Sequence, residues 1–408
     1  MDKDAVKYCT LPSGLRIVHR YSDSPVEYCG VAVNVGSRDE TVVQHGLAHF
    51  VEHTIFKGTA RRRSWHIINR MESIGGELNA YTTKEETMLY SVFPNGYLGR
   101  ALELIADLVT SSQFPETELA KEREVVADEI NSYLDTPSEA IFDDYEDLLF
   151  AGSSLGHNIL GSVESLSGFT SDVCRDYLDS HYTSGNMVLF YMGRTTPERL
   201  MKYVETYLSG LLAGERTGRV VNVPVNAPFD LRRETGNHQC HTVIGARLPG
   251  MYSELRYPIA LLTNIVGGPG MNSLLNVSLR ERRGLVYTVD ASSSMFTDVG
   301  EFTIYFGCDA EDIKTCRRIV LNHLDSMASS QMPVRRLEAA KKQYLGQLTV
   351  ASDNKEQMAL STARATLYHG RVATAEEITE RIMAITPESL REVAELVSPS
   401  NCSILTFG

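Results

Sequence analysis

The sequence predicts an α+β fold of two homologous domains, each a mainly antiparallel β-sheet covered by helices, joined by an extended linker. Three observations lead to this prediction: a length of 408 residues, an apolar content of 43%, and an order of elements that repeats at an offset of 218 residues. The length is too great for one ordinary core, and the composition is that of a globular protein rather than a disordered or fibrous one.

The repeat is clearest around a short segment without helical pattern. Residues 111–115 (SSQFP) recur as residues 329–333 (SSQMP). Before each copy, apolar residues at helical spacing predict an amphipathic helix, and after each copy a charged helix begins. Further upstream, both copies contain two β-rich runs. The predicted helices cover residues 97–110, 116–131, 313–327 and 334–348, and the predicted strands cover 78–83, 87–93, 285–295 and 301–307.

The segment between the two copies predicts the domain boundary. Residues 214–228 carry Gly, Pro and Asn and have no helical periodicity, which is typical of an extended linker. The predicted domains are therefore residues 1–212 and 231–408, with 213–230 as the linker. Each half begins with strands and a helix, continues through strands and two long helices, and is expected to close with a strand followed by a helix.

Charge and cysteine content exclude several classes of function. Residues 1–212 carry a net charge of −13 and residues 213–408 a net charge of zero. This acidic first half argues against a nucleic-acid partner and against an anionic membrane surface. The seven cysteines have no ligand-like spacing and are expected to be reduced. No long apolar stretch and no export signal are visible, so we expect a soluble, cytoplasmic protein.

One pentapeptide in the first half carries the residue types of a metal site. His49 and His53 lie four residues apart in residues 44–56, which we expect to be helical, so both imidazoles can face one ion. Glu52 lies three residues after His49 and borders the same face. Two histidines with an acidic neighbour are the parts of a catalytic zinc site, and the HxxEH order is the signature of inverted zincins.

Such a site needs a third ligand, which this helix does not supply. The best candidates are Glu122 and Glu129, which are seven residues apart and therefore lie on one face of the helix over 116–131. The alternative is that these acids belong to a solvated charged face. The repeat favours a site, because Glu122 corresponds to Ala340, Glu129 corresponds to Gln347, and the second half has no HxxEH.

These motifs together resemble one family. Residues 46–53 (GLAHFVEH), 56–59 (FKGT) and 75–82 (GGELNAYT) are similar to the inverted-zincin metallopeptidases of family M16, which include mitochondrial processing peptidase, pitrilysin and insulin-degrading enzyme. The resemblance covers nearly the whole chain and is closest to the short, processing-peptidase branch. It implies a zinc metalloendopeptidase with one Zn²⁺ per chain, and the 76 residues from His53 to Glu129 match the family's spacing.

The resemblance also implies roles for individual residues. His49, His53 and Glu129 would bind zinc, Glu52 would be the general base, and Glu122 would be an acid in the outer shell of the site, where Glu124 or Asp128 could serve instead.

Substrate-binding residues follow from the same resemblance. Asn79 and Ala80 would lie on an edge strand to which an extended peptide adds; an interior strand with all its hydrogen bonds filled is the alternative. Arg280 and Tyr287 in the second half resemble the family's Arg and Tyr pair, which approaches the substrate, although both could be ordinary helix-end and strand residues.

Two further functions stay open beside a peptidase that cleaves unfolded peptides or leader segments. A non-catalytic binding or assembly subunit of the same fold is the first, and metal binding without hydrolysis is the second. Because the zinc motif and the Arg and Tyr pair lie in one chain, a homodimer is the simpler assembly, with a heterodimer with an inactive partner as the alternative.

Overall fold

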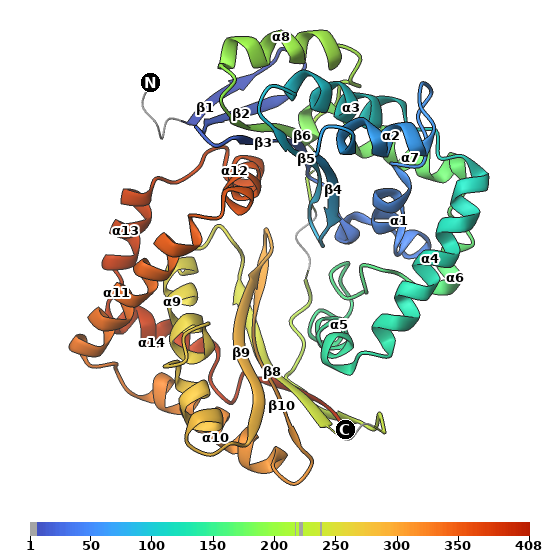
Figure 1. Ribbon diagram of the computed structural model, residues 1–408. Coiled ribbons are helices and arrows are strands. Elements are labelled where there is room, and N and C mark those ends of the chain that lie inside the picture. Colours follow the sequence, from blue (N-terminus) through green and yellow to red (C-terminus); the bar gives the residue numbers. More distant parts are fainter. Residues whose placement is uncertain (1–5, 217, 220–222, 237–238) are drawn as a thin grey trace. The chain divides into compact units, whose positions relative to one another are not determined.

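The chain forms two compact units in the computed structural model, which describes residues 6–216, 218–219, 223–236 and 239–408 (Figure 1). Unit 1 contains the described residues of 1–131, 157–220 and 352–372. Unit 2 contains those of 132–156, 221–351 and 373–408. Each unit has its own sheet and its own buried core.

Unit 1 is built on a six-stranded sheet in the order β1-β2-β6-β3-β5-β4, in which only the β2–β6 pair is parallel. Its elements are β1 (Val6–Thr10), β2 (Arg16–Tyr21), β3 (Val26–Val33), η1 (Ser37–Asp39), η2 (Val42–Gln44), α1 (Leu47–Thr54), α2 (Ser64–Glu72), β4 (Glu77–Thr82), β5 (Thr87–Pro94), α3 (Leu98–Ser111), α4 (Glu116–Leu134), α6 (Val163–Leu166), α7 (Ser171–His181), η3 (Ser184–Asn186), β6 (Met187–Gly193), α8 (Pro197–Tyr207) and α12 (Lys355–His369). Helix α4 runs three residues past the end of this unit's first segment.

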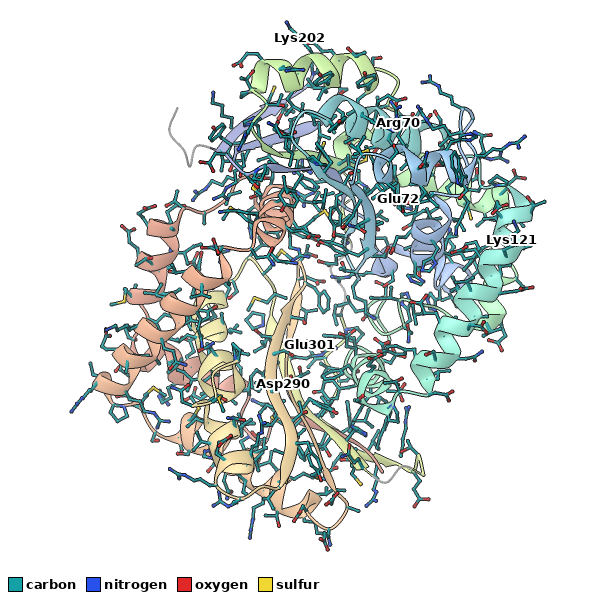
Figure 2. The ribbon with its side chains drawn as sticks, in the orientation of Figure 1. Arg70, Glu72, Lys121, Lys202, Asp290 and Glu301 are labelled. Carbon is teal, nitrogen blue, oxygen red and sulfur yellow. The ribbon has the colours of Figure 1, made fainter. Side chains whose placement is uncertain are left out.

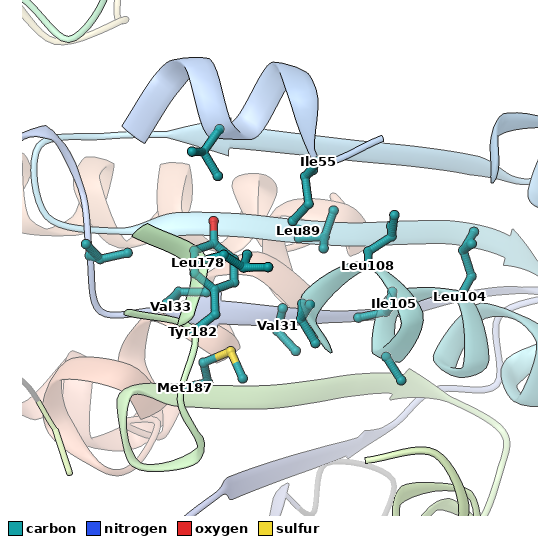
Figure 3. Packing of buried hydrophobic residues seen from close by; sticks show 14 of the residues in the cluster. Val31, Val33, Ile55, Leu89, Leu104, Ile105, Leu108, Leu178, Tyr182 and Met187 are labelled. Carbon is teal, nitrogen blue, oxygen red and sulfur yellow. The ribbon is translucent and has the colours of Figure 1, made fainter. Parts of the chain in front are cut away.

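The core of unit 1 lies between one face of this sheet and helices α1, α3 and α7. Ile105 and Leu108 of α3 pack against Val31 of β3, and Ile55 at the end of α1 joins the same cluster (Figure 3). These side chains are at most 2% exposed, and each contributes about 1.5–3 kcal/mol through burial. The core therefore holds the helix that carries His49 and His53 against the sheet.

Unit 2 repeats this plan on a five-stranded sheet in the order β7-β11-β8-β10-β9, in which only the β7–β11 pair is parallel. Its elements are α5 (Pro137–Leu149), β7 (Asp230–Arg233), β8 (Gln239–Pro249), α9 (Arg256–Gly267), η4 (a π-helical turn, Asn276–Glu281), β9 (Val286–Met295), β10 (Val299–Asp309), α10 (Ile313–Ser329), α11 (Val334–Ala351), α13 (Ala375–Met383), α14 (Pro387–Leu396) and β11 (Ser403–Phe407). Two mainly antiparallel sheets with helices confirm the predicted fold class.

The two units exchange one helix each. Helix α5 comes from the first half of the sequence but packs against β8 and β11 of unit 2. Helix α12 is the corresponding helix 218 residues later, and it packs against β2, β3 and β6 of unit 1 (Figure 1). Each sheet is thus covered by a helix from the other half of the sequence, an arrangement that the contiguous domains 1–212 and 231–408 do not contain.

The predicted linker is partly described. Residues 217 and 220–222 lie outside the described residues, and the remaining residues from 213 to 229 form neither helix nor strand. Asp230, the last predicted linker residue, begins β7. Arg219 is anchored in unit 1, because its guanidinium donates to both carboxylate oxygens of Asp39, at 3.0 and 2.8 Å, and to Oδ1 of Asn34 at 2.8 Å.

Some local predictions need correction. The metal-site helix begins at Leu47 rather than near residue 44. Gly46 has a left-handed φ of +96°, which a regular α-helix does not contain, so the helix starts after it. The closing strand and helix occur in the first half, as β6 and α8, but the second half closes with α14 followed by β11. All seven cysteines lie in the described part of the chain and are free, and all but Cys9 are buried. No described helix is long and apolar enough to span a membrane.

Candidate metal centre

Helix α1 presents two different faces. Leu47, Phe50 and Val51 are buried in the core of unit 1 and fix the orientation of the helix. His49 and His53 share another face, and their ring centroids lie 4.5 Å apart at an interplanar angle of 62°. The i, i+4 spacing predicted from the sequence therefore brings the two imidazoles together.

Glu129 of α4 completes a group of three possible ligands. Its Oε1 lies 3.8 Å from Nε2 of His49, and its Oε2 lies 3.4 Å from Nε2 of His53. The three ligand atoms fall within 4.8 Å of one another. Ligand atoms placed tetrahedrally at zinc–ligand distances of 2.0–2.2 Å are roughly 3.3–3.6 Å apart. The two nitrogens and the carboxylate thus fit a zinc ion, which prefers this donor set.

The two histidines differ in their environment. Burial, with a smaller effect of nearby His53, lowers the pKa of His49 to about 3, so this imidazole is neutral and has a free lone pair for a metal. Burial also lowers the pKa of His53, but the hydrogen bond to Glu122 and the charge of Glu129 outweigh it, and the pKa of His53 is raised overall. Glu122 and Glu129 of α4 therefore favour the protonated, positively charged form of His53.

Glu122 contacts His53 from the side opposite to the candidate ligand atom. Nδ1 of His53 lies 3.1 Å from Oε1 of Glu122, while Oε2 of Glu122 accepts from Nζ of Lys57 at 2.6 Å. A proton held on Nδ1 leaves Nε2 free to bind a metal. Burial raises the pKa of Glu122, but the bonds from His53 and Lys57 outweigh it and lower the pKa overall. Glu124 and Asp128 are exposed.

The charged side chains of α4 differ in their exposure to solvent. The side chain of Glu122 is 9% exposed, whereas that of Lys121 is 68% exposed and pairs with Glu118 on the outside of the helix (Figure 2). Glu129, at 44%, stays partly open to solvent. Both predicted descriptions hold on one helix, because one face carries a solvated charge pattern and another reaches the two histidines.

Glu52 lies beside this group. Burial raises the pKa of Glu52; the neighbouring Thr82 at the end of β4 and the charge of His53 oppose this shift, while the charge of Glu129 adds to it. These interactions place the Glu52 carboxyl within electrostatic range of a histidine and of the distal glutamate.

Strand β4 forms an edge of the unit 1 sheet. Among the described strands it pairs only with β5, with Asn79 opposite Tyr90 and Ala80 opposite Leu89. Both Asn79 and Ala80 are half-buried. The structure therefore contradicts the alternative of an interior strand, and β4 has a free side for pairing with another extended chain.

Arg280 and Tyr287 belong to unit 2, so the structure does not group them with the residues of unit 1 described above. Arg280 lies in η4 and lines a pocket of about 340 Å³ together with the glycine-rich segment 267–270 and Asp290 of β9. Tyr287 is 69% exposed on β9, which is the edge strand of its sheet. A role of these two residues in binding substrate stays a prediction.

Sequence reasoning missed three residues around the metal helix. Lys57 was part of a recognised motif, but only the fold shows that it pairs with Glu122. Glu40 accepts hydrogen bonds from the backbone at the start of α1, and His157 contacts Glu40. The local signal for Glu40 is weak, because an acid seven residues before the first residue of a helix is common in loops.

The chain also resembles known proteins along nearly its whole length. Residues 16–163 match the family described as Insulinase (Peptidase family M16), and residues 168–344 match the Peptidase M16 inactive domain. An uncharacterized zinc protease of Bacillus subtilis is 30% identical, over 97% of this chain and 98% of its own length. One of Mycobacterium tuberculosis is 32% identical, over 96% and 90%. A crystal structure of a peptidase M16 inactive domain from Pseudomonas fluorescens has the same fold, with a TM-score of 0.92 at 16% identity over 99% of this chain and 98% of that one.

Proposed function

Because the chain belongs to peptidase family M16, we propose that it is a zinc-dependent endopeptidase that hydrolyses peptide bonds in unfolded peptides or leader segments. The observation that carries this proposal is the convergence of His49, His53 and Glu129, with Glu52 beside them. A subunit that had lost catalysis would have no need to retain the complete group.

The proposed mechanism assigns one task to each residue. His49, His53 and Glu129 hold one zinc ion per chain, which when bound supplies a Lewis acid that makes water more acidic and polarises the peptide carbonyl. Glu52 accepts a proton from the attacking water on a carboxylate oxygen. It then donates this proton to the amine nitrogen as the C–N bond breaks. Glu122 keeps the proton of His53 on Nδ1, so that Nε2 stays available.

Substrate recognition is proposed to rest on main-chain pairing. An extended peptide adds to β4 beside Asn79 and Ala80, where the strand has a free side. This mode demands little of the substrate's sequence, but it requires an unfolded segment. Arg280 and Tyr287 are proposed as further substrate contacts, and their removal should raise KM without loss of metal.

The test is hydrolysis of a mixture of quenched fluorescent peptides, with bound zinc counted in the same samples. Wild-type protein should cleave, chelation should abolish cleavage, and added zinc should restore it. Glu52→Gln should retain its zinc and lose about 10²–10⁴-fold in kcat, the usual contribution of a general base. Glu124→Gln is the matched control, because it makes the same change at an exposed acid of α4 and should leave both readouts unchanged.

Two results would sink the proposal. If Glu52→Gln cleaves as fast as wild type, Glu52 is not the base. If wild type binds zinc but cleaves none of the peptides alone, the hypothesis of a homodimeric enzyme is wrong. The chain is then a partner-dependent or non-catalytic subunit, and addition of a candidate partner chain becomes the next experiment.

A further inference from the structure

A buried carboxylate holds the start of the metal helix. The side chain of Glu40 is fully buried, at 0% exposure, in the segment between β3 and α1. Its Oε2 accepts from the backbone N–H of Gly46 at 2.9 Å, and its Oε1 accepts from the N–H of Ala48 at 2.6 Å. Two of the backbone donors that a helix start leaves without intrahelical partners are therefore bound by one side chain.

This contact substitutes for an ordinary helix cap. Gly46 is the residue before the first helical residue and has no side chain to cap with. It cannot be replaced readily, since a Cβ there would lie 2.7 Å from the carbonyl oxygen of Leu160, and its φ is +96°. The direction in which α1 leaves this turn is thus set by Glu40 and by the segment that contains Leu160.

The segment from residue 157 to residue 161 braces Glu40 and Gly46 from more than a hundred positions later in the sequence. Nε2 of His157 lies 3.1 Å from Oε2 of Glu40, and the His157 ring stacks on His45 at 3.8 Å and 5°. Gly161 packs so closely that a Cβ on it would lie 2.3 Å from the carbonyl oxygen of His45. The turn before α1 is therefore held on two sides.

We propose that Glu40, supported by His157, is a positioning residue of the metal centre that sets the start of α1 and thereby the direction of His49 and His53. His49 follows directly after Ala48, whose N–H Glu40 holds. The inference rests on the proposed zinc site but not on peptide hydrolysis, because its readout is zinc affinity.

The amide variant separates this role from simple space filling. Glu40→Gln keeps the shape of the side chain, but it replaces one of the two acceptor oxygens with an NH₂ group. An amide nitrogen cannot accept from Gly46 or Ala48, so one backbone N–H loses its partner and faces another donor. Either orientation of the amide has this defect. A carboxyl oxygen accepts in both protonation states, so the argument does not depend on the charge of Glu40.

Glu27 offers a matched control in the same unit. It is equally buried, and its Oε1 accepts from the hydroxyl of Tyr191 at 2.9 Å and from the N–H of Arg194 at 3.1 Å. Its Oε2 has no hydrogen-bond partner among the described residues. In Glu27→Gln the NH₂ group can therefore take the position of Oε2, where it faces no other hydrogen-bond donor. This substitution does not touch the turn before α1.

The experiment measures zinc affinity by competition with a chromogenic chelator, together with thermal unfolding of the zinc-free proteins. We expect Glu40→Gln to weaken zinc binding by about 10–100-fold, the range found when outer partners of metal ligands are removed, and Glu27→Gln to stay within about twofold of wild type. His157→Gln should weaken zinc binding by a smaller factor. In Glu40→Gln and His157→Gln, kcat should fall more than KM changes, since substrate pairing at β4 is intact.

Each outcome bears on the inference. Zinc affinity of Glu40→Gln equal to that of wild type, with only a lower unfolding temperature, would show that Glu40 stabilises the fold without positioning the site. If Glu40→Gln does not fold, His157→Gln decides, and unchanged zinc affinity there overturns the inference. Wild-type protein that binds zinc without cleaving peptides would overturn the proposed function and leave this inference standing.

Discussion

The two repeats carry a pair of helices at the same places in their order of elements: α1 and α4 in unit 1, and α9 and α11 in unit 2. The side chains that connect the two helices of a pair differ between the units. In unit 1, His49 and His53 face Glu129 across the pair. In unit 2, the residue at the position of Glu129 is Gln347, whose Oε1 accepts from Nδ2 of Asn264 at 2.7 Å. An uncharged amide pair thus joins the second pair of helices, so the fold itself does not demand metal ligands at this point.

The position of Glu122 shows the same contrast. Its equivalent is Ala340, which packs against the apolar core of unit 2. A buried acid in unit 1 is tolerated because His53 and Lys57 donate to it, whereas the corresponding position in unit 2 holds the apolar Ala340. The fold that the two repeats share therefore does not require an acid at either position.

The largest expected effect comes from separating the two halves. A chain cut after residue 212 lacks α12, whose Leu360, Leu367 and Tyr368 are buried against the unit 1 sheet. Their loss removes roughly 5 kcal/mol, comparable with the whole stability of a domain. We expect no cooperative thermal unfolding of this fragment by calorimetry. Fusing residues 352–372 to it should restore the transition, and a fragment that folds without them would show that the helix exchange is dispensable.

The next effect comes from giving unit 1 the chemistry of unit 2. Glu129→Gln removes the charged ligand and should weaken zinc binding by at least about 100-fold, more than removal of an outer partner does, and peptide hydrolysis should fall below detection. Gln347→Glu is the reciprocal control and should change neither property. Equilibrium dialysis with metal analysis measures zinc binding, and cleavage of the quenched fluorescent peptides measures hydrolysis. Stoichiometric zinc in Glu129→Gln at the wild-type affinity would rule out Glu129 as the third ligand.

A smaller effect is expected from copying Ala340 into the first repeat. Glu122→Ala leaves Nδ1 of His53 without its acceptor and Lys57 without its partner, so zinc affinity should fall by about 10–100-fold. Titration against a competing chelator measures this change. Glu118→Ala, at a half-buried position of the same helix where the carboxylate pairs with Lys121, should have no effect. Equal losses in the two variants would mean that helix charge in general, rather than the contact with His53, determines affinity.

The smallest effect is expected in unit 2. Gln347→Leu removes the partner of Asn264 and should lower the free energy of unfolding by about 1–2 kcal/mol, the usual result of leaving a partly buried amide unpaired. Denaturant titration measures the loss. The zinc content should stay at the wild-type value. A change in zinc affinity in this variant would show that unit 2 influences the metal centre.

Much of this structure follows from local sequence patterns. Hydrophobic periodicity predicted α3, α4, α10 and α11 to within a few residues, and HxxEH at helical spacing predicted that His49 and His53 face the same way. Glu122 and Glu129 were singled out from the other acids of α4 by their spacing of seven residues, which puts them on one face of the helix. Local patterns are sufficient in these cases because the interacting residues lie on one helix or at one fixed offset.

The remaining features depend on contacts between distant segments. Glu40 and His157 are 117 residues apart, and nothing in either local sequence marks the other as its partner. Likewise, the periodicity of α5 and α12 shows an apolar face but not which sheet that face will cover. The start of α1 was predicted three residues too early, because the left-handed turn at Gly46 depends on its packing against Gly161.

The most direct test is a count of zinc per chain in wild type, in Glu52→Gln and in the double variant His49→Ala/His53→Ala, each checked for cooperative unfolding. One zinc per chain in the first two proteins and none in the third is the expected result, because the histidines hold the metal and Glu52 does not. A full equivalent of zinc in the folded double variant, or none in wild type, would contradict a zinc centre on α1.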